Sequence, residues 1–152
     1  MNNLAILTTG LKEVVEVLKS YPRNQAKIDM LRLELERFKN DNSTYTGVKG
    51  ISYEQKGSKT NKFNSDVENE VIDREKRENE LQSKIKDLTL MNLQIDAALN
   101  ILTPREKEII EKKYFKRMRN IDIAGDVNLT EEYLCDVRTG ILKNLSGILF
   151  ID

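Results

Sequence analysis

The densest group of chemically active side chains is a run of cations between residues 105 and 119. It holds seven Lys and Arg against three Glu, a local net charge of +4, whereas the whole chain carries 25 residues of each sign. Clustered cations neutralise phosphates, which supplies most of the affinity of proteins for nucleic acid. They also suit the negative end of a helix, which is the alternative reading of the same cluster. Five of them gather near the predicted end of one helix, namely Lys112, Lys113, Lys116, Arg117 and Arg119.

The residue types that usually carry catalysis are scarce. The chain of 152 residues has no His and a single Cys, Cys135. His is the commonest general base and metal ligand, and one Cys alone cannot build a structural zinc site. The many carboxylates alternate with Lys and Arg at helical spacing, which is typical of solvated helix faces. We therefore expect no enzyme activity, no metal and no other cofactor. A lone Cys also fits a cytoplasmic location.

The cation cluster belongs to a predicted three-helix module over residues 102–152. Thr103 and Glu106 form a capping box around Pro104, which marks the start of a helix. A short second helix ends near Asn128, a residue type that tolerates a left-handed backbone. Thr130 is the predicted cap of a third helix. This pattern predicts a helix-turn-helix whose core includes Ile110, Ala124, Leu129, Leu134 and Val137.

The third helix of this module would read DNA if the module binds it. The side chains expected to face the groove are Tyr133, Arg138, Thr139 and Lys143, with the five cations named above on the flanking backbone. Glu131 and Glu132 run against this interpretation, because carboxylates near phosphates weaken binding. They are also favourable at a helix N-terminus, and a carboxylate can accept from cytosine.

The module resembles region four of bacterial sigma factors. Residues 102–110 read LTPREKEII, and Ile123-Ala124 is followed by LTEEYLCDVRTGILKNL over residues 129–145. More narrowly, the whole chain resembles the phage-encoded ArpU/RinA-like transcriptional regulators, through Tyr21-Pro22, Ser58-Lys59-Thr60 and the terminal module. The resemblance implies a phage or prophage regulator, most simply an activator, that acts on double-stranded DNA.

Residues 1–40 are predicted to form a helical hairpin. Leu11, Val14 and Leu18 lie at helical spacing, and Gly10 is a weak point in this first helix. Because the residue before a proline is pushed out of the α region, Tyr21-Pro22 should end the first helix. A second helix would run to about residue 40.

A polar loop is predicted over residues 41–64. Its Gly57-Ser58-Lys59-Thr60 superficially resembles the end of a Walker A loop, but the spacing and order are wrong for nucleotide binding. A solvated linker is the simpler interpretation of this loop. Alternatively, four of its lysines could contact phosphates: Lys49, Lys56, Lys59 and Lys62.

Residues 65–101 are predicted to form one long helix that a second capping box opens at Ser65. Apolar residues recur along it at heptad spacing, and Asn92 falls on an a-type position, where a buried Asn can set oligomer state. This seam can pack inside the chain, against the N-terminal helices, or between copies in a homo-oligomer. We favour packing inside the chain.

The expected fold class is therefore all-α. The first functional hypothesis is a DNA-binding transcriptional regulator. Two alternatives stay open: a protein-interaction module that contacts RNA polymerase or another partner without reading DNA, and a phage DNA-packaging protein of the small-terminase type. No apolar run is long enough to span a membrane, so we expect no membrane partner.

Overall fold

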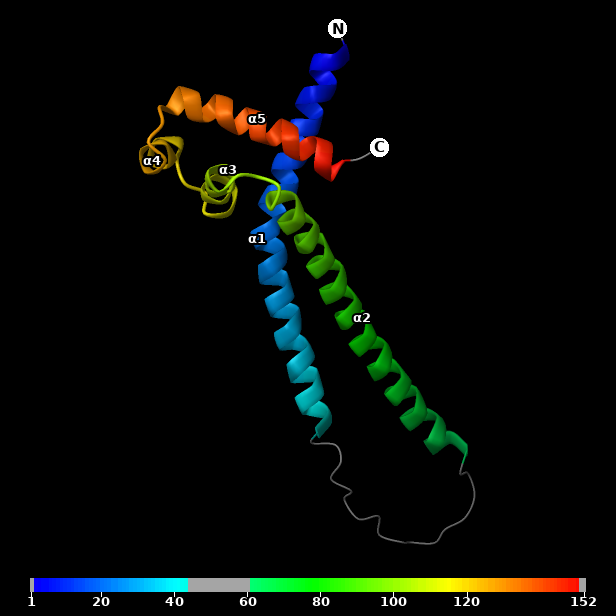
Figure 1. Cartoon of the computed structure of the whole chain (residues 1–152). Coiled ribbons are helices and arrows are strands. Elements are labelled where there is room, and N and C mark those ends of the chain that lie inside the picture. The colour runs from blue at the N-terminus through cyan, green and yellow to red at the C-terminus, as the bar shows by residue number, and fades with distance from the viewer. Residues whose placement is uncertain (1, 44–60, 151–152) are drawn as a thin grey trace. The chain divides into compact units, whose positions relative to one another are not determined.

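A computed structural model describes residues 2–43 and 61–150, and the side chains of residues 10–41 and 69–150. These residues are helical apart from short connections, and no strand occurs among them (Figure 1). The chain is all-α over the part that the structure describes. In order, its elements are α1 (Asn2–Ser43), α2 (Asn61–Leu99), α3 (Pro104–Ile110), the π-helical turn η2 (Glu111–Phe115), α4 (Asn120–Asp126) and α5 (Glu131–Leu149).

The N-terminal hairpin predicted over residues 1–40 is wrong. One helix, α1, runs through the expected break and carries Pro22 in its interior. An interior proline costs about 3 kcal/mol, because it removes a backbone donor and its ring meets the preceding turn. Tertiary contacts around the proline offset this cost. Leu18 and Val14 are fully buried one and two turns before it, and Asn24 is buried just after it.

Tyr21 contributes to the same compensation. Its ring stacks on that of Phe115, with centroids 4.6 Å apart and planes 9° from parallel. Its carbonyl oxygen accepts a hydrogen bond from Nδ2 of Asn92 at 3.2 Å. The Tyr-Pro pair is therefore an anchoring point inside α1 and does not end the helix.

The expected start of the long central helix is also wrong, by four residues. The helix α2 begins at Asn61, so Ser65 lies inside it and is not its cap. The loop predicted over residues 41–64 is wrong at both ends, because residues 41–43 belong to α1 and residues 61–64 to α2. The rest of that prediction lies outside the described residues. The candidate phosphate contacts Lys49, Lys56 and Lys59 lie outside the described residues, as does the side chain of Lys62.

The chain divides into two compact units, which are described separately. The first comprises residues 1–26 and 89–152, and the second comprises residues 27–88. The boundaries proposed from the sequence at residues 40, 64 and 101 follow helices and loops, whereas the first unit combines two distant parts of the chain.

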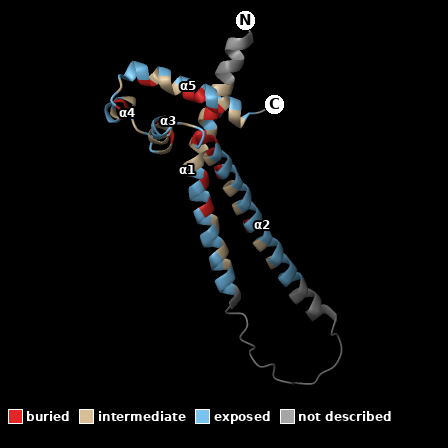
Figure 2. Cartoon of the chain, in the orientation of Figure 1, coloured by how far each residue is buried: buried red, intermediate tan, exposed pale blue. Residues whose placement is uncertain are grey.

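The core of the first unit joins α1, the end of α2 and the C-terminal helices (Figure 2). Val14 and Leu18 of α1 lie in the same buried cluster as Ile95 and Leu99 of α2. The other buried members of this cluster come from the end of α2 and from the C-terminal helices: Ala98, Ile109, Ile110, Tyr114, Ile123, Ala124, Val127, Leu134, Ile141, Leu142 and Leu145. Ile95 and Leu99 of the heptad seam thus pack against other helices of the same chain.

The predicted cap of α3 is confirmed. Thr103 Oγ1 accepts from the Glu106 amide at 3.3 Å, and the Glu106 carboxylate accepts from the Thr103 amide at 2.9 Å. Two orphan donors of the first turn are satisfied in this way, with Pro104 at the first helical position. The local sequence alone therefore fixes where this helix begins.

The connection between α4 and α5 also follows its predicted chemistry. Asn128 adopts φ 53°, in the left-handed region. The Leu129 amide then donates to the Ala124 carbonyl at 2.9 Å, which closes α4 as a Schellman motif. Thr130 caps α5 by accepting from the Tyr133 amide at 3.3 Å. Of the expected core, Ile110, Ala124 and Leu134 are buried, while Leu129 and Val137 pack against its edge.

Two helices of the first unit approach closely at Gly10. A Cβ on Gly10 of α1 would lie 3.3 Å from Oγ of Ser146 on α5. A Cβ at this position would require the Ser146 side chain to shift by a few tenths of an ångström. This glycine, which weakens the helix locally, therefore allows a close crossing.

The second unit is a pair of antiparallel helical segments. Its buried apolar side chains are Ile28 of α1 and Leu81 of α2. Arg77 bonds Glu34 at 3.0 Å, and Lys39 pairs with Glu78 at 3.5 Å. Throughout the described residues, no helix has the length and apolar character needed to cross a membrane.

Candidate functional site

Two of the five predicted backbone cations are engaged in ion pairs within the module. Lys112 Nζ lies 2.7 Å from a carboxylate oxygen of Glu108 and 2.7 Å from one of Asp126. Arg119 reaches both carboxylate oxygens of Asp122, at 2.8 and 3.0 Å. Hydrogen bonds with these carboxylates raise the pKa of Lys112, and the pairing with Arg119 lowers the pKa of Asp122.

These two cations differ in their surroundings. The Lys112 side chain is 15% exposed and links η2 to the end of α4, so its first role is structural. The Arg119 side chain is 80% exposed at the cap position of α4 and pairs with Asp122, three residues further along the chain. Exposed pairs of this kind contribute little to stability, and Arg119 keeps its availability for an external anion.

Arg105 also has a structural role. Its guanidinium donates to the Val127 carbonyl at 2.6 Å, which ties the start of α3 to the end of α4. A carbonyl at a helix C-terminus has no partner within the helix, and a cation satisfies it well. Part of the local charge that stands out in the sequence therefore holds the module together.

The other three predicted backbone cations differ from Lys112 and Arg119. Within the described part of the chain, no ion pair or side-chain hydrogen bond involves Lys113, Lys116 or Arg117. Arg117 has φ 56°, a conformation that is rare for a residue with a side chain. This conformation lets the Met118 amide donate to the Lys112 carbonyl at 3.0 Å and so closes η2.

A hollow of about 340 Å³ brings Lys113 and Arg117 together with two cations of α1. We call it the basic hollow, and its lining residues are Lys19, Arg23, Lys113, Tyr114 and Arg117. Lys19 and Arg23 were not among the predicted site residues. Their spacing in the sequence is that of an ordinary solvated helix face, so only the packing of α1 on η2 shows that they belong to this group.

Tyr114 forms the buried wall of the basic hollow. Its side chain is 7% exposed, and burial raises the pKa of its phenol, against the opposing charge of Arg138. The phenol therefore stays neutral over the physiological range and adds no negative charge to the hollow.

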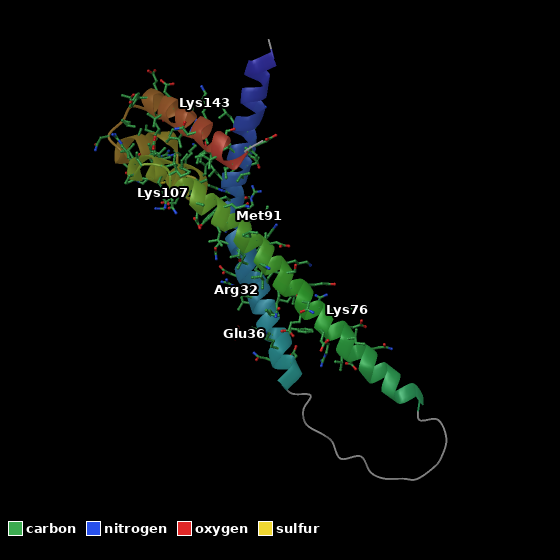
Figure 3. The ribbon with its side chains drawn as sticks, turned by 45° about the vertical axis from the view of Figure 1, so that its right-hand side comes forward. Arg32, Glu36, Lys76, Met91, Lys107 and Lys143 are labelled. Atoms are coloured by element: carbon green, nitrogen blue, oxygen red, sulfur yellow. The ribbon has the colours of Figure 1, made fainter. Side chains whose placement is uncertain are left out.

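The candidate groove residues lie on α5 in different environments. Arg138 is partly buried and donates to Oδ1 of Asn120 on α4 at 3.3 Å. Thr139 Oγ1 donates to the Cys135 carbonyl at 2.9 Å, within its own helix. Tyr133 and Lys143 are exposed, and Figure 3 marks Lys143 on α5. The four residues thus do not form one uniformly exposed set.

Glu131 and Glu132 are both exposed in the first turn of α5. They lie beside the Thr130 cap, where a negative charge stabilises the helix. The start of α5 is consequently acidic, whereas the basic hollow lies between α1 and η2. In the residues that the structure describes, no group of three or more Cys, Asp or Glu side chains is placed to hold a metal ion.

A family model described as "Protein of unknown function (DUF722)" matches residues 12–146. The chain belongs to this family. The DUF722 match runs from α1 into α5, so it includes every element that lines the basic hollow. No curated protein matches the chain. Searching the solved structures likewise gives no match for this DUF722 chain.

Proposed function

We propose that this DUF722 chain is a DNA-binding transcriptional regulator that acts through α4, the following turn and α5 as a helix-turn-helix. The observation that carries the proposal is the connection itself. A seven-residue helix ends at a left-handed Asn128, and a capped helix of 19 residues follows. That order of short helix, tight turn and longer second helix is the arrangement that places a recognition helix in the major groove.

The distribution of cations supports the same proposal. Lys113, Lys116 and Arg117 form no ion pair with any residue that the structure describes, and Arg119 is exposed, so together they can approach phosphates beside the module. In this proposal α5 contacts the bases. Lys143 and Tyr133 are exposed there, and Arg138 can release its hydrogen bond with Asn120 and donate to the edge of a base instead. The resemblance to sigma-like phage regulators adds phage or prophage genes as the target and activation as the mode of regulation, in the bacterial cytoplasm.

Titration of labelled duplex DNA at two salt concentrations tests the proposal. We expect Lys116→Ala to weaken binding to all sequences and to lower the salt slope by about one, whereas Arg138→Ala costs about 1–3 kcal/mol and relaxes preference at one base pair. Asn120→Ala is the matched control, because it removes the same internal bond and leaves the Arg138 guanidinium in place.

The acidic turn gives a second, independent readout. If the start of α5 approaches phosphates, Glu131→Gln with Glu132→Gln should raise non-specific affinity, since two like charges are removed from the contact. Sequencing of DNA recovered with the chain from host lysate would identify the target. Binding that shows no dependence on salt or on these residues would refute the proposal.

One observation favours a second function, a protein-interaction module that contacts RNA polymerase or another partner. Ile121 on α4 is 59% exposed and Tyr133 on α5 is 57% exposed. Exposed apolar and aromatic side chains beside carboxylates suit a protein surface better than a phosphate backbone. This alternative would be established if the chain binds no DNA and recovers one partner protein from host lysate. Ile121→Ser and Tyr133→Ser should each abolish that recovery.

A further inference from the structure

The basic hollow is the strongest unassigned feature of the first unit. Four of its five lining residues are cations, and they come from two separate elements, α1 and η2 with its following turn. Like charges repel, so an anion that binds among four cations is attracted by all of them and lowers their mutual repulsion. We propose that the basic hollow binds a phosphate group of the DNA backbone, with Lys19 and Arg23 of α1 completing a site that the C-terminal module begins. This inference rests on the proposed function and deepens it.

The local charge balance supports an anionic ligand. Among the side chains that the structure describes, no carboxylate lines the hollow. Lys19 pairs with Glu16 at 3.1 Å on the same helix, and the two side chains are 42% and 65% exposed. An exposed pair of this kind is weak, so Lys19 can turn to a phosphate at small cost. Within the part of the chain that the structure describes, Arg23, Lys113 and Arg117 form no ion pair.

The backbone of Arg117 is a second, independent observation. A left-handed conformation costs a residue with a side chain about 1–2 kcal/mol, and glycine is the usual occupant of such a helix end. Here the position holds a guanidinium that lines the hollow. Strained backbone of this kind concentrates at functional sites. The π-helical turn η2 immediately before it is also a geometry that is frequent at such sites.

A backbone phosphodiester fits the hollow better than a free phosphate. Arg23 and Arg117 are exposed and Lys19 and Lys113 are partly exposed, so the cations form an open rim that a strand can pass. Long flexible cations on an open surface are typical contacts for the DNA backbone.

Salt-dependent titration of labelled duplex DNA tests the inference with matched variants of α1. Arg23→Gln and Lys19→Gln each remove one cation of the hollow. Arg32→Gln and Lys12→Gln each remove an exposed cation of the same helix that does not line the hollow. Each hollow variant should lower the salt slope by about 0.9, which is about an eightfold loss of affinity at 0.1 M salt. The control variants should leave the slope unchanged.

Each result decides between named readings. If DNA binds and Arg23→Gln behaves like Arg32→Gln, the inference is overturned and the proposed function stands. If no variant or parent binds DNA, the proposed function fails and a DNA phosphate is excluded as the ligand. Thermal unfolding in inorganic phosphate against chloride, at equal ionic strength, then separates the remaining cases. Stabilisation by phosphate that Arg23→Gln abolishes would reassign the hollow to free phosphate, and its absence would remove the site altogether.

Discussion

Asn24 of α1 and Asn92 of α2 form a hydrogen bond across the first unit, from Nδ2 of Asn24 to Oδ1 of Asn92 at 3.2 Å. Both side chains are buried, and Asn92 also donates to the Tyr21 carbonyl. A buried polar group is stable only when it is hydrogen-bonded, and here Asn24 donates to Asn92 while Asn92 donates to the Tyr21 carbonyl. The polar position in the heptad seam is therefore satisfied within one chain.

Removing one member of this pair should be costly. We expect Asn92→Leu to lower the free energy of unfolding by about 1–3 kcal/mol, because it leaves the buried Asn24 amide without the Asn92 oxygen as its acceptor. The double variant with Asn24→Leu should recover much of that loss. Urea unfolding of both variants measures the coupling. A change of oligomer state in sedimentation of Asn92→Leu would instead indicate a seam shared between copies.

Ala124 should tolerate no larger side chain. It is buried where α4 packs on α5, and its carbonyl closes the turn that follows. Ala124→Leu is expected to cost about 1–3 kcal/mol through overpacking. The neighbouring Gly125 faces open space, so Gly125→Ala should stabilise the same helix by about 0.5–1 kcal/mol. Thermal unfolding of the two variants would contradict the tight crossing if both were equally stable.

Arg117→Gly should change stability and binding in opposite directions. Relief of the left-handed conformation should raise the free energy of unfolding by about 1 kcal/mol. Loss of the guanidinium should lower the salt slope for DNA by about one. Lys116 is the matched control, because it is exposed with an ordinary φ of −89°. Lys116→Gly should give no gain in stability, and an Arg117→Gly protein less stable than the parent would argue against strain.

Alkaline pH should weaken the fold through Tyr114. Burial raises the pKa of this phenol above the ordinary value of 10.0, so the neutral form is favoured in the folded state. Its contribution is fully present below pH 10.0 and is lost as the pH rises through the higher folded value. Unfolding free energies measured on both sides of pH 10.0 should therefore fall less steeply in Tyr114→Phe. An equally steep fall in Tyr114→Phe and in the parent would contradict this role of Tyr114.

The caps and turn of the C-terminal module were predictable because each depends on a few adjacent residues. The structure contains the predicted capping box of Thr103 and Glu106, the left-handed Asn128 and the Thr130 cap. Pro22 misled the prediction for the opposite reason. The local cost of the proline is outweighed by the contacts of the adjacent Tyr21 with Phe115 and Asn92. Both partners lie about seventy or more residues further along the chain.

The basic hollow was only half predictable. Lys113 and Arg117 stand out in a local run of charge, whereas Lys19 and Arg23 join them only through packing. The sequence also could not show which cations form ion pairs inside the protein and which stay available to a ligand. Lys112 and Lys113 are adjacent, yet the first bridges two carboxylates and the second lines the hollow.

The first unit is a discontinuous domain, since residues 27–88 are inserted between its two parts. The bond between Asn24 and Asn92 places the points where the insertion leaves and re-enters close together in space. Domains whose insertion points are adjacent usually tolerate exchange of the inserted segment. A C-terminal fragment that begins at residue 102 would lack Val14, Leu18, Ile95 and Leu99 and would expose the apolar surface they cover. The smallest self-sufficient form of the C-terminal helices is thus a chain in which a short connector replaces the insertion and α1 is retained.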